Sequence, residues 1–316
     1  MTLIRFEDVK QCYEVDKPII KNLNLSIEKG EFVVLIGPSG CGKTTILKMM
    51  NGLIKPSSGQ IFVKEKDISQ WDPIELKRNM GYVIQQIGLF PHMNIEKNIT
   101  YSLDIQKSIP IDKHKRACEL INLVGLDEDY LKKYPKELSG GQRQRIGIAR
   151  ALAADPEIIL MDEPLGAVDQ INRKVLQDEI LRIYQTLHKT IVLVTHDIEE
   201  AIKLGTKIVV LSDGEIMQAG VRDEIVFKNE NEFVNDFIGN KGFLSYLNII
   251  KIKNYISPIY ENHNQTSSKF CVKSDEKLIV GIRMCLENGL NRVCVRDEKE
   301  NVVGQFELSS LSSMKF

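Results

Sequence analysis

The segment Gly37–Thr44 combines residue types and a spacing that suit phosphate binding. It reads GPSGCGKT and directly follows the apolar run Phe32–Ile36, so the pattern Gly-x-x-x-x-Gly-Lys-Thr stands where a strand would lead into a helix. Its three glycines let successive backbone N–H groups converge on an anion, and the positive end of the following helix would point at the same anion. Lys43 adds a charge for the β and γ phosphates, and Thr44 offers a hydroxyl to Mg²⁺. The segment therefore predicts a site for a nucleoside triphosphate with Mg²⁺.

A second glycine motif, LSGGQ at residues 138–142, stands about a hundred residues further along the chain. It opens a segment whose apolar residues at 146, 148, 149 and 152 follow helical spacing. Ser-Gly-Gly at the start of a helix can bind an anion, and it can also be an N-cap with a flexible lead-in. One chain rarely needs two phosphate sites so far apart, unless the second serves a nucleotide bound mainly by another copy.

Polar residues close three apolar runs that are typical of strands buried in a parallel sheet. The runs are 157–162, which ends in Asp162 with Glu163 after it, 190–195, which is followed by His196, and 79–85, which ends in Gln85. Open α/β sheets bind ligands at the carboxyl ends of their strands. From this position Asp162 would hold Mg²⁺, and Glu163 would polarise the water that attacks the γ phosphate.

The order of these motifs resembles the ATP-binding cassette family, in which two subunits close head to tail over two ATP molecules. The resemblance covers roughly residues 1–240 and implies an ATPase with the α/β fold of a P-loop cassette. That fold has a mostly parallel sheet, an antiparallel β subdomain and a helical subdomain. The resemblance implies ATP and Mg²⁺ as cofactors.

The resemblance also implies a role for each motif residue. In catalysis it implies Glu163 as the residue that positions water, His196 as a switch at the γ phosphate, and Gln85 as a contact to metal and water. The implied metal-binding residues are Thr44, Gln85 and Asp162. The implied ATP-binding residues are Tyr13, Gly37, Pro38, Ser39, Gly40, Cys41, Gly42, Lys43, Thr44, Thr45, Ser139, Gly140, Gly141, Gln142 and Asp169. Tyr13 would stack on adenine, although a tyrosine near an amino-terminal strand is usually a packing residue, and Asp169 would contact the second subunit.

The coarse pattern alternates strands and helices, as a parallel nucleotide-binding sheet requires. Helical spacing predicts helices at 44–51, 112–124, 141–154 and 172–187. An antiparallel strand is expected near 61–63, and an antiparallel hairpin around residues 213–214.

The stretch 87–100 has a loop-like composition but contains Leu89, Phe90 and Met93. Exposed apolar groups of this kind indicate a docking surface, whereas a loop packed against its own domain explains the same residues equally well. The resemblance to the cassette family, which binds its membrane subunit in this region, favours docking.

Composition limits the classes of protein that the chain can belong to. At 316 residues there is room for about two domains, and 43% apolar with 27% charged residues is typical of a soluble globular protein. A net charge of −1 gives no support for nucleic-acid binding. The amino terminus lacks an apolar signal core, and no apolar run approaches the roughly 18 residues that span a bilayer, so we expect a cytosolic protein that touches a membrane only through partners. The six cysteines show no metal-binding spacing and are expected to be reduced.

We expect the cassette at residues 1–240, a linker at 241–265 that includes most of the polar stretch NHNQTSS, and a small α+β module at 266–316. The module has a helix pattern at 278–287, strand patterns at 292–296 and 302–306, and a short final helix. It resembles one copy of the regulatory module first described in cystathionine β-synthase, which normally works in pairs.

The module departs from the adenosine-binding pattern of that family. Adenosine-binding copies have Ser or Thr and then Asp after the closing glycine, whereas here Gly304 is followed by Glu307 and Ser310. A ribose contact is therefore not expected. Ligand sensing and plain packing or dimerisation stay open as alternatives.

Residues 81–93 and 151–164 look like the ATPase subunits of bacterial importers for quaternary-ammonium osmolytes such as glycine betaine, carnitine and choline. This resemblance implies a homodimer of ATPase subunits on the cytoplasmic face of the cell membrane, membrane-spanning permease subunits and an extracytoplasmic solute-binding protein. An importer of another small solute, such as an amino acid, is an alternative. A cassette ATPase of DNA repair or translation is less favoured, because the chain has one cassette and no extended heptad run. A GTPase is not expected, because the sequence has no Asn-Lys-x-Asp motif for guanine.

Overall fold

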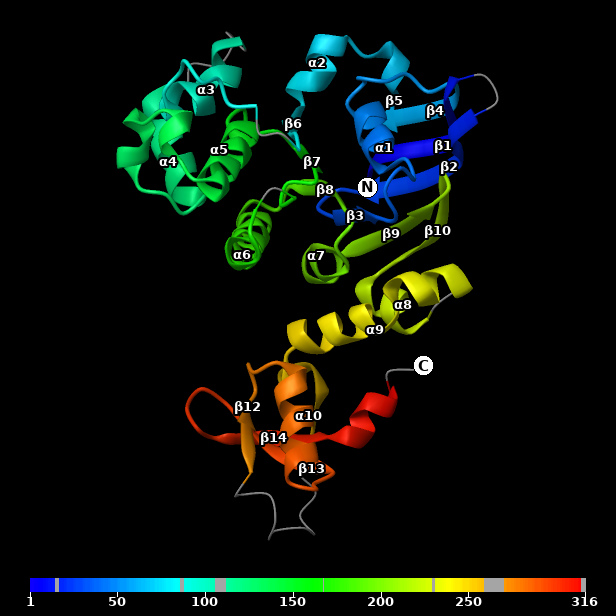
Figure 1. The fold of residues 1–316 in the computed structure, drawn as a ribbon, viewed down its shortest axis with the longest axis vertical. Helices are drawn as coiled ribbons and strands as arrows, with labels where there is room; N and C mark the ends of the chain where they lie inside the picture. The colour runs from blue at the N-terminus through cyan, green and yellow to red at the C-terminus, as the bar shows by residue number, and fades with distance from the viewer. Residues whose placement is uncertain are drawn as a thin grey trace. The chain divides into compact units, whose positions relative to one another are not determined.

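The structure, a computed structural model, describes residues 1–14, 17–85, 88–105, 112–166, 168–228, 231–258 and 270–313. The chain forms two compact units, Met1–Val221 and Arg222–Phe316, and Figure 1 shows the course of the chain through each. The first unit ends before residue 240, where the sequence pattern placed the end of the cassette.

A six-stranded sheet with the order β10-β9-β3-β8-β7-β6 forms the centre of the first unit (Figure 1). Its strands are β3 (Phe32–Ile36), β6 (Met80–Val83), β7 (Ile158–Asp162), β8 (Thr190–Thr195), β9 (Lys207–Ser212) and β10 (Glu215–Gly220). They run parallel except for β10, which pairs antiparallel with β9 through the predicted hairpin at 213–214. Every residue of β3, β7 and β8 is buried, which explains why their sequences are mostly apolar.

The first unit also contains an antiparallel sheet with the order β2-β1-β4-β5. Its strands are β1 (Thr2–Glu14), β2 (Lys17–Glu28), β4 (Ser58–Val63) and β5 (Lys66–Asp67). Helix α1 (Lys43–Met50) contributes Ile46, Leu47 and Met50 to a hydrophobic core that also contains side chains of both sheets. This core fixes the start of α1 near the carboxyl end of β3.

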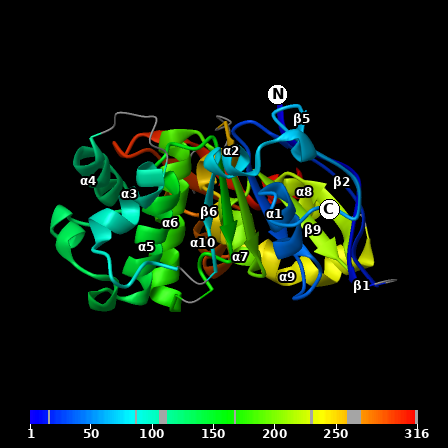
Figure 2. The same cartoon turned by 90° about the horizontal axis from the view of Figure 1, so that it is seen from above.

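Three helices form a group on the β6 side of the central sheet (Figure 2): α3 (Ile95–Ile105), α4 (Lys113–Leu123) and α5 (Gly140–Leu152). The other elements of this unit are α2 (Pro73–Arg78), α6 (Gln170–Leu187), α7 (Ile198–Leu204) and the 3₁₀ helices Ile68–Gln70, Glu128–Lys132 and Pro135–Glu137. The four predicted helices are confirmed to within two residues at each end. Local capping explains one of these ends, because the carboxylate of Asp112 accepts the N–H of Lys115 and so begins α4.

The second unit contains a four-stranded sheet with the order β11-β14-β13-β12. Its elements are α8 (Arg222–Phe227), α9 (Glu232–Ile249), the 3₁₀ helix Ile252–Tyr255, β11 (Ile256–Ser257), β12 (Cys271–Lys273), α10 (Leu278–Glu287), β13 (Arg292–Arg296), β14 (Val302–Glu307) and the 3₁₀ helix Leu308–Ser313. Both α10 and β13 have the predicted bounds. Gly281 lets α10 approach the sheet, because a Cβ at this position would lie 2.9 Å from Cδ1 of Phe306.

The range 241–265, which the sequence pattern assigned to a linker, consists mostly of regular structure in its described part, 241–258. Residues 241–258 include the end of α9, a 3₁₀ helix and β11, which pairs with β14. The linker signal came from the polar stretch 262–268, which lies outside the described residues. Helix α9 also bends at Gly239, with φ 35° and ψ −141°, and such a break hides helical periodicity in the sequence.

Candidate functional site

The loop between β3 and α1 has a geometry that requires its glycines. Gly40 and Gly42 have φ values of 83° and 102°, in the region that favours glycine. A Cβ at Gly37 would lie 2.1 Å from the carbonyl oxygen of Leu211. Gly42 is the N-cap of α1 and has no capping side chain, so the helix presents backbone N–H groups to the loop. Close contacts behind the loop exclude side chains at Gly37 and Gly42, and the N–H groups of the loop form a cradle that fits an anion.

Lys43 lies inside this cradle and is 6% exposed. Its Nζ donates to the carbonyl oxygens of Gly37, at 2.8 Å, and Pro38, at 2.7 Å, and it lies 3.6 Å from Sγ of Cys41. The ammonium group is thus satisfied in a buried position by the backbone of its own loop. A phosphate oxygen offers the same group a stronger, charge-assisted hydrogen bond, so the residues present fit a nucleotide phosphate.

Two oxygen-containing side chains that could bind a metal ion meet next to the cradle, at the carboxyl end of β7. Oγ1 of Thr44 donates to Oδ1 of Asp162 at 2.8 Å. Burial raises the pKa of Asp162, and burial together with Asp162 raises the pKa of Tyr82 to about 12. Hydroxyl and carboxylate oxygens are ligand types that Mg²⁺ prefers, so this pair fits a Mg²⁺ site. Sequence reasoning missed Tyr82, and its only signal was an aromatic residue with a polar tip near the end of a buried strand.

The three side chains predicted to be catalytic converge beyond the ends of β6, β7 and β8. Nε2 of Gln85 donates to Oε2 of Glu163 at 3.0 Å, and Nδ1 of His196 lies 3.6 Å from Oε1 of the same carboxylate. Glu163 has a φ of 43°, a left-handed conformation that costs a non-glycine residue roughly 1–2 kcal/mol, and its N–H donates to the carbonyl oxygen of Val194. Such strain concentrates at functional sites. In this structure Gln85 binds the carboxylate of Glu163 instead of the Thr44–Asp162 pair.

The LSGGQ motif begins α5, and its serine is the N-cap. Oγ of Ser139 accepts the N–H of Gln142 at 3.3 Å, and Oε1 of Gln142 accepts the N–H of Ser139 at 2.9 Å. This reciprocal pair confirms the N-cap interpretation. Gly140 and Gly141 are the first two residues of the helix, so by position their N–H groups have no acceptor within it. A Cβ added at Gly141 would have its nearest neighbour, Cβ of Asn172, at 3.9 Å.

Asp169 and Tyr13 both lie at the surface of the first unit. Oδ1 of Asp169 accepts the backbone N–H of Asn172 at 3.1 Å, and Oδ2 accepts its side-chain amide at 2.7 Å, so Asp169 caps α6. These hydrogen bonds lower the pKa of Asp169. Tyr13 is 57% exposed, and its hydroxyl lies 3.4 Å from Oγ1 of Thr45, which places it beside the start of α1. The roles predicted for both residues require a second subunit and a nucleotide.

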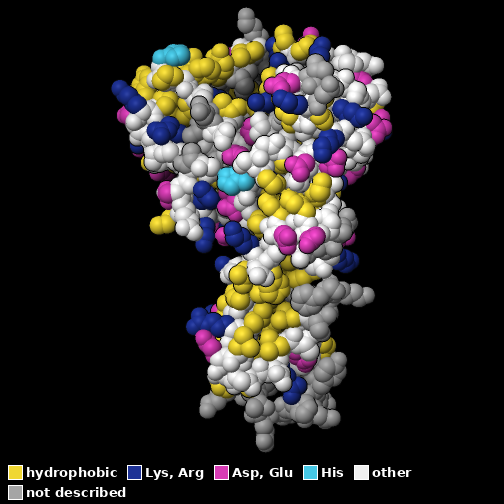
Figure 3. Space-filling view, turned by 45° about the vertical axis from the view of Figure 1, so that its right-hand side comes forward, with side chains coloured by type: hydrophobic (Ala, Val, Ile, Leu, Met, Phe, Trp, Pro, Cys, Tyr) yellow, Lys and Arg dark blue, Asp and Glu magenta, His cyan; other side chains and the backbone are white. Residues whose placement is uncertain are grey.

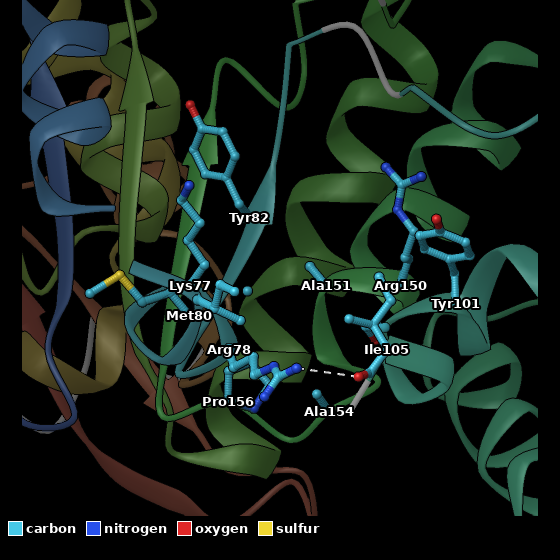
Figure 4. A pocket seen from close by; sticks show the side chains of 13 residues that line it. Lys77, Arg78, Met80, Tyr82, Tyr101, Ile105, Arg150, Ala151, Ala154 and Pro156 are labelled. Atoms are coloured by element: carbon cyan, nitrogen blue, oxygen red, sulfur yellow. Dashed lines mark hydrogen bonds between the residues drawn. The ribbon is translucent and has the colours of Figure 1, made fainter. Parts of the chain in front are cut away.

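A cavity of about 340 Å³ lies between α2, β6, α3 and α5 (Figure 4). Its lining is mostly apolar and includes Ile74, Met80, Ile105 and Pro156, with Tyr101 and Arg150 on the helical side. The dashed line in Figure 4 marks the hydrogen bond from Nη2 of Arg78 to the carbonyl oxygen of Ile105, at 3.3 Å. The cavity thus opens where the helical group meets the strand that leads to Gln85.

Leu89, Phe90 and Met93 of the stretch 87–100 are partly buried, and its first residue lies outside the described part of the chain. Nδ2 of Asn98, on α3, donates to the carbonyl oxygens of Phe90 and Met93, both at 3.1 Å. The ring of Phe90 also packs against Tyr101 at a centroid distance of 4.5 Å. This loop is therefore packed against its own domain.

A family model described as ABC transporter matches residues 20–166. The chain belongs to this family and contains the ABC ATPase cassette fold. A solved dimeric structure of the ATP-binding cassette MJ0796, in a post-hydrolysis state bound to ADP and Pi, superposes with a TM-score of 0.63 at 34% identity, over 69% of this chain and 98% of that chain.

Two curated relatives carry more specific names. Over 309 residues the chain is 45% identical to the glycine betaine/carnitine/choline transport ATP-binding protein OpuCA of Bacillus subtilis. The matched region covers 98% of this chain and 79% of that protein. It is 53% identical over 239 residues to the choline transport ATP-binding protein OpuBA of the same organism, over 76% of this chain and 63% of that protein.

Proposed function

We propose that the chain binds ATP and Mg²⁺ at residues 37–45, hydrolyses the ATP, and couples hydrolysis to the import of quaternary-ammonium osmolytes through a membrane transporter. The observation that carries the ATPase part is the convergence of Gln85 and His196 on Glu163, beside the pair formed by Thr44 and Asp162. The transport part is supported by the relatives, which are named as ATP-binding proteins for glycine betaine, carnitine and choline transport.

Each residue of the proposed site has a separate task. The N–H groups of the loop and Lys43 bind and orient the phosphates. Thr44 and Asp162 would hold Mg²⁺, which would neutralise phosphate charge, and Gln85 would join them as the family resemblance implies. Glu163 accepts a hydrogen bond from the attacking water and takes its proton. Since Gln85 and His196 contact one oxygen each of this carboxylate, they fix its orientation.

The LSGGQ motif and Asp169 complete the proposed site from a second copy of the chain. In the first unit Ser139 and Asp169 cap the helices α5 and α6, where backbone N–H groups face outward. A γ phosphate of the other copy would bind at Ser139 and Gly141, whose N–H groups suit an anion. The solved relative that is described as dimeric supports a homodimer of this kind.

The apolar cavity of the first unit is the proposed docking site for a permease subunit. Its lining includes Tyr82, which lies on β6 and contacts Asp162, so a partner seated there is one strand away from the site of hydrolysis. In the part of the chain that the structure describes, no helix is long and apolar enough to cross a membrane. A place on the cytoplasmic face of the membrane would therefore depend on such permease subunits, and solute recognition on a separate extracytoplasmic binding protein.

Residues 266–316, within the second unit, are proposed to be one copy of a module like that of cystathionine β-synthase. Helix α10 is followed by the antiparallel pair β13 and β14, as that resemblance implies. The carboxylate of Glu307 accepts from Nε2 of Gln305 at 2.6 Å and from Oγ of Ser309 at 2.9 Å. Oγ of Ser310 donates to the carbonyl oxygen of Glu307 at 2.5 Å. Because these groups bind one another, the contacts favour packing or dimerisation over a ribose site.

Exposed apolar side chains of the second unit support a dimerisation role. Figure 3 shows hydrophobic surface on this unit, and among its described residues the exposed large hydrophobic ones are Leu244, Leu286, Val302 and Val303. Burial of such side chains is favourable at about 25 cal/mol per Å² of apolar surface. We therefore expect the same unit of a second subunit to cover them.

Solute-stimulated ATP hydrolysis by the reconstituted complex tests the whole proposal. The purified chain should hydrolyse MgATP, and its complex with permease and binding protein should be stimulated by glycine betaine, carnitine or choline. Stimulation by an amino acid alone would favour the alternative importer. A chain that binds no ATP would overturn the ATPase proposal itself.

A further inference from the structure

One arginine of α6 joins the loops that follow β7 and β8. Nη2 of Arg173 donates to the carbonyl oxygen of Val168 at 3.3 Å, one residue before Asp169. Nη1 of the same guanidinium group donates to Oδ2 of Asp197 at 3.4 Å, one residue after His196. A planar guanidinium with donors on several edges is the side chain best suited to span two such acceptors. The loop of Asp169 and the loop of His196 therefore share one rigid connection.

Glu200, on the first turns of α7, completes this cluster. Its side chain is 4% exposed, and Oε1 lies 4.0 Å from Nε of Arg173, a buried nitrogen without a hydrogen-bond partner. Oε2 accepts from Oγ1 of Thr195 at 2.5 Å, and that hydroxyl accepts the N–H of Asp197 at 3.1 Å. Both neighbours of His196 are thus tied to the cluster, one from each side.

The carboxylate of Glu200 is expensive to bury, and this cost argues that the cluster does more than hold α6 and α7 together. Removing a carboxylate from water costs several kcal/mol, and apolar residues of similar volume often stabilise a protein as well as a buried ion pair does. Burial raises the pKa of Glu200 to about 7 despite the nearby Arg173, and Asp197 and His196 are the other charged groups that act on it. Packing of α6 against α7 alone would not need a buried carboxylate and an arginine. Fixing the position of the loop that contains His196 would need such polar groups.

We propose that Arg173 and Glu200 are positioning residues that hold the His196 loop in register with the Asp169 loop. The proposal rests on the proposed roles of His196 at the γ phosphate and of Asp169 at the second subunit. Asp169 lies on the surface that is proposed to contact the second copy. His196 lies beside Glu163 within the same copy. When the second subunit contacts the Asp169 loop, the guanidinium group therefore transmits the resulting shift to the His196 loop, and His196 completes the hydrolytic site.

Steady-state kinetics of Arg173→Met provide the first test. The variant keeps most of the aliphatic packing and loses both loop contacts, so kcat should fall roughly 10- to 100-fold, as expected when a catalytic group is displaced by about 1 Å. KM for ATP should stay within about twofold, since the phosphate loop is built on β3 and α1. The matched control is Lys203→Met. It breaks another ion pair between α7 and α6, from Nζ to Oδ1 of Asp178 at 2.7 Å, away from both loops, and kcat should be retained.

A double-mutant cycle with His196→Ala decides whether Arg173 acts through the histidine. If it does, the double variant should be no slower than His196→Ala alone; if the two losses multiply, Arg173 acts independently and the proposal is overturned. Unchanged kcat in Arg173→Met, with activity lost in His196→Ala, would refute the inference and leave the proposed function standing. Unchanged kcat in His196→Ala would remove the role of His196 and the inference with it. Should Arg173→Met fail to fold, Arg173→Lys and Glu200→Gln, which keep the volume of the cluster, replace it in the same cycle.

Discussion

Glu163→Gln keeps the shape of the side chain and removes the group that is proposed to take a proton from water. In the structure one carboxylate oxygen accepts from Gln85 at 3.0 Å and the other lies 3.6 Å from His196. A glutamine can keep the first contact through its carbonyl oxygen, but its NH₂ group then faces the imidazole, and it cannot act as a base. General-base assistance contributes about 10²- to 10⁴-fold, so kcat should fall by that factor, or about 3 to 5 kcal/mol of transition-state stabilisation.

ATP binding should survive in this variant, because the phosphate loop and Lys43 are held by contacts of their own. Phosphate release at saturating MgATP gives kcat, and calorimetry gives the Kd for ATP. Light scattering should detect an ATP-dependent dimer, which accumulates because hydrolysis no longer causes it to dissociate. Glu199→Gln, an exposed position on α7, is the matched control and should keep wild-type turnover. A kcat for Glu163→Gln within about threefold of wild type would refute the assignment of Glu163 as the base.

Three further predictions concern the two copies, the phosphate loop and pH. Gly141→Asp should leave ATP binding to the monomer intact and abolish ATP-driven dimerisation and hydrolysis, because the nearest neighbour of an added Cβ is 3.9 Å away whereas the new carboxylate repels a γ phosphate; an ATP-dependent dimer in light scattering would contradict this. Cys41 is only 5% exposed, with its Sγ 3.6 Å from Nζ of Lys43, so maleimide should inactivate the enzyme slowly and MgATP should protect it; sensitivity that persists in Cys41→Ser would assign the effect to another cysteine. Burial raises the pKa of Glu200 from 4.5 to about 7, so the stability contributed by its protonated form is complete below pH 4.5 and is lost as the pH rises through about 7. Urea unfolding should show this loss, about 3 kcal/mol, in the wild type and not in Glu200→Gln, and equal pH profiles would refute it.

The strands and helices that the sequence predicted well are those whose burial follows a simple pattern. The strands Phe32–Ile36 and Thr190–Thr195 are buried at every position, so their sequences are short apolar runs with sharp ends. The amino-terminal pair β1 and β2 was not among the predicted elements, because register shifts interrupt its pairing and with it the alternation of apolar and polar residues. The elements within 241–257 were missed because the kink at Gly239 breaks the helical period and because β11 is only two residues long.

The candidate site was predictable to the extent that strand ends determine position. Parallel pairing alone brings Gln85, Glu163 and His196 to one edge of the sheet, and motif order supplied their identities. The contacts of Arg173 and Glu200 with the loops of Asp169 and His196 were not evident from the sequence. Both residues lie on helices, where a charged residue usually faces solvent. The available signal was spacing, since Arg173 follows Asp169 by four residues, or one helical turn, and Glu200 follows His196 by four residues.

The two interpretations that the sequence left open for LSGGQ are compatible in this structure. Ser139 caps α5 with its hydroxyl, and the cap uses the N–H of Gln142, the third helical residue. The N–H groups of Gly140 and Gly141 precede it, and neither can bond within the helix. A phosphate arriving from a second copy would meet these two donors without displacing the cap, and both residues lack a Cβ that would hold it away. Capping fixes the direction of the first turn of α5, which would hold both N–H groups in place for a phosphate of a second copy.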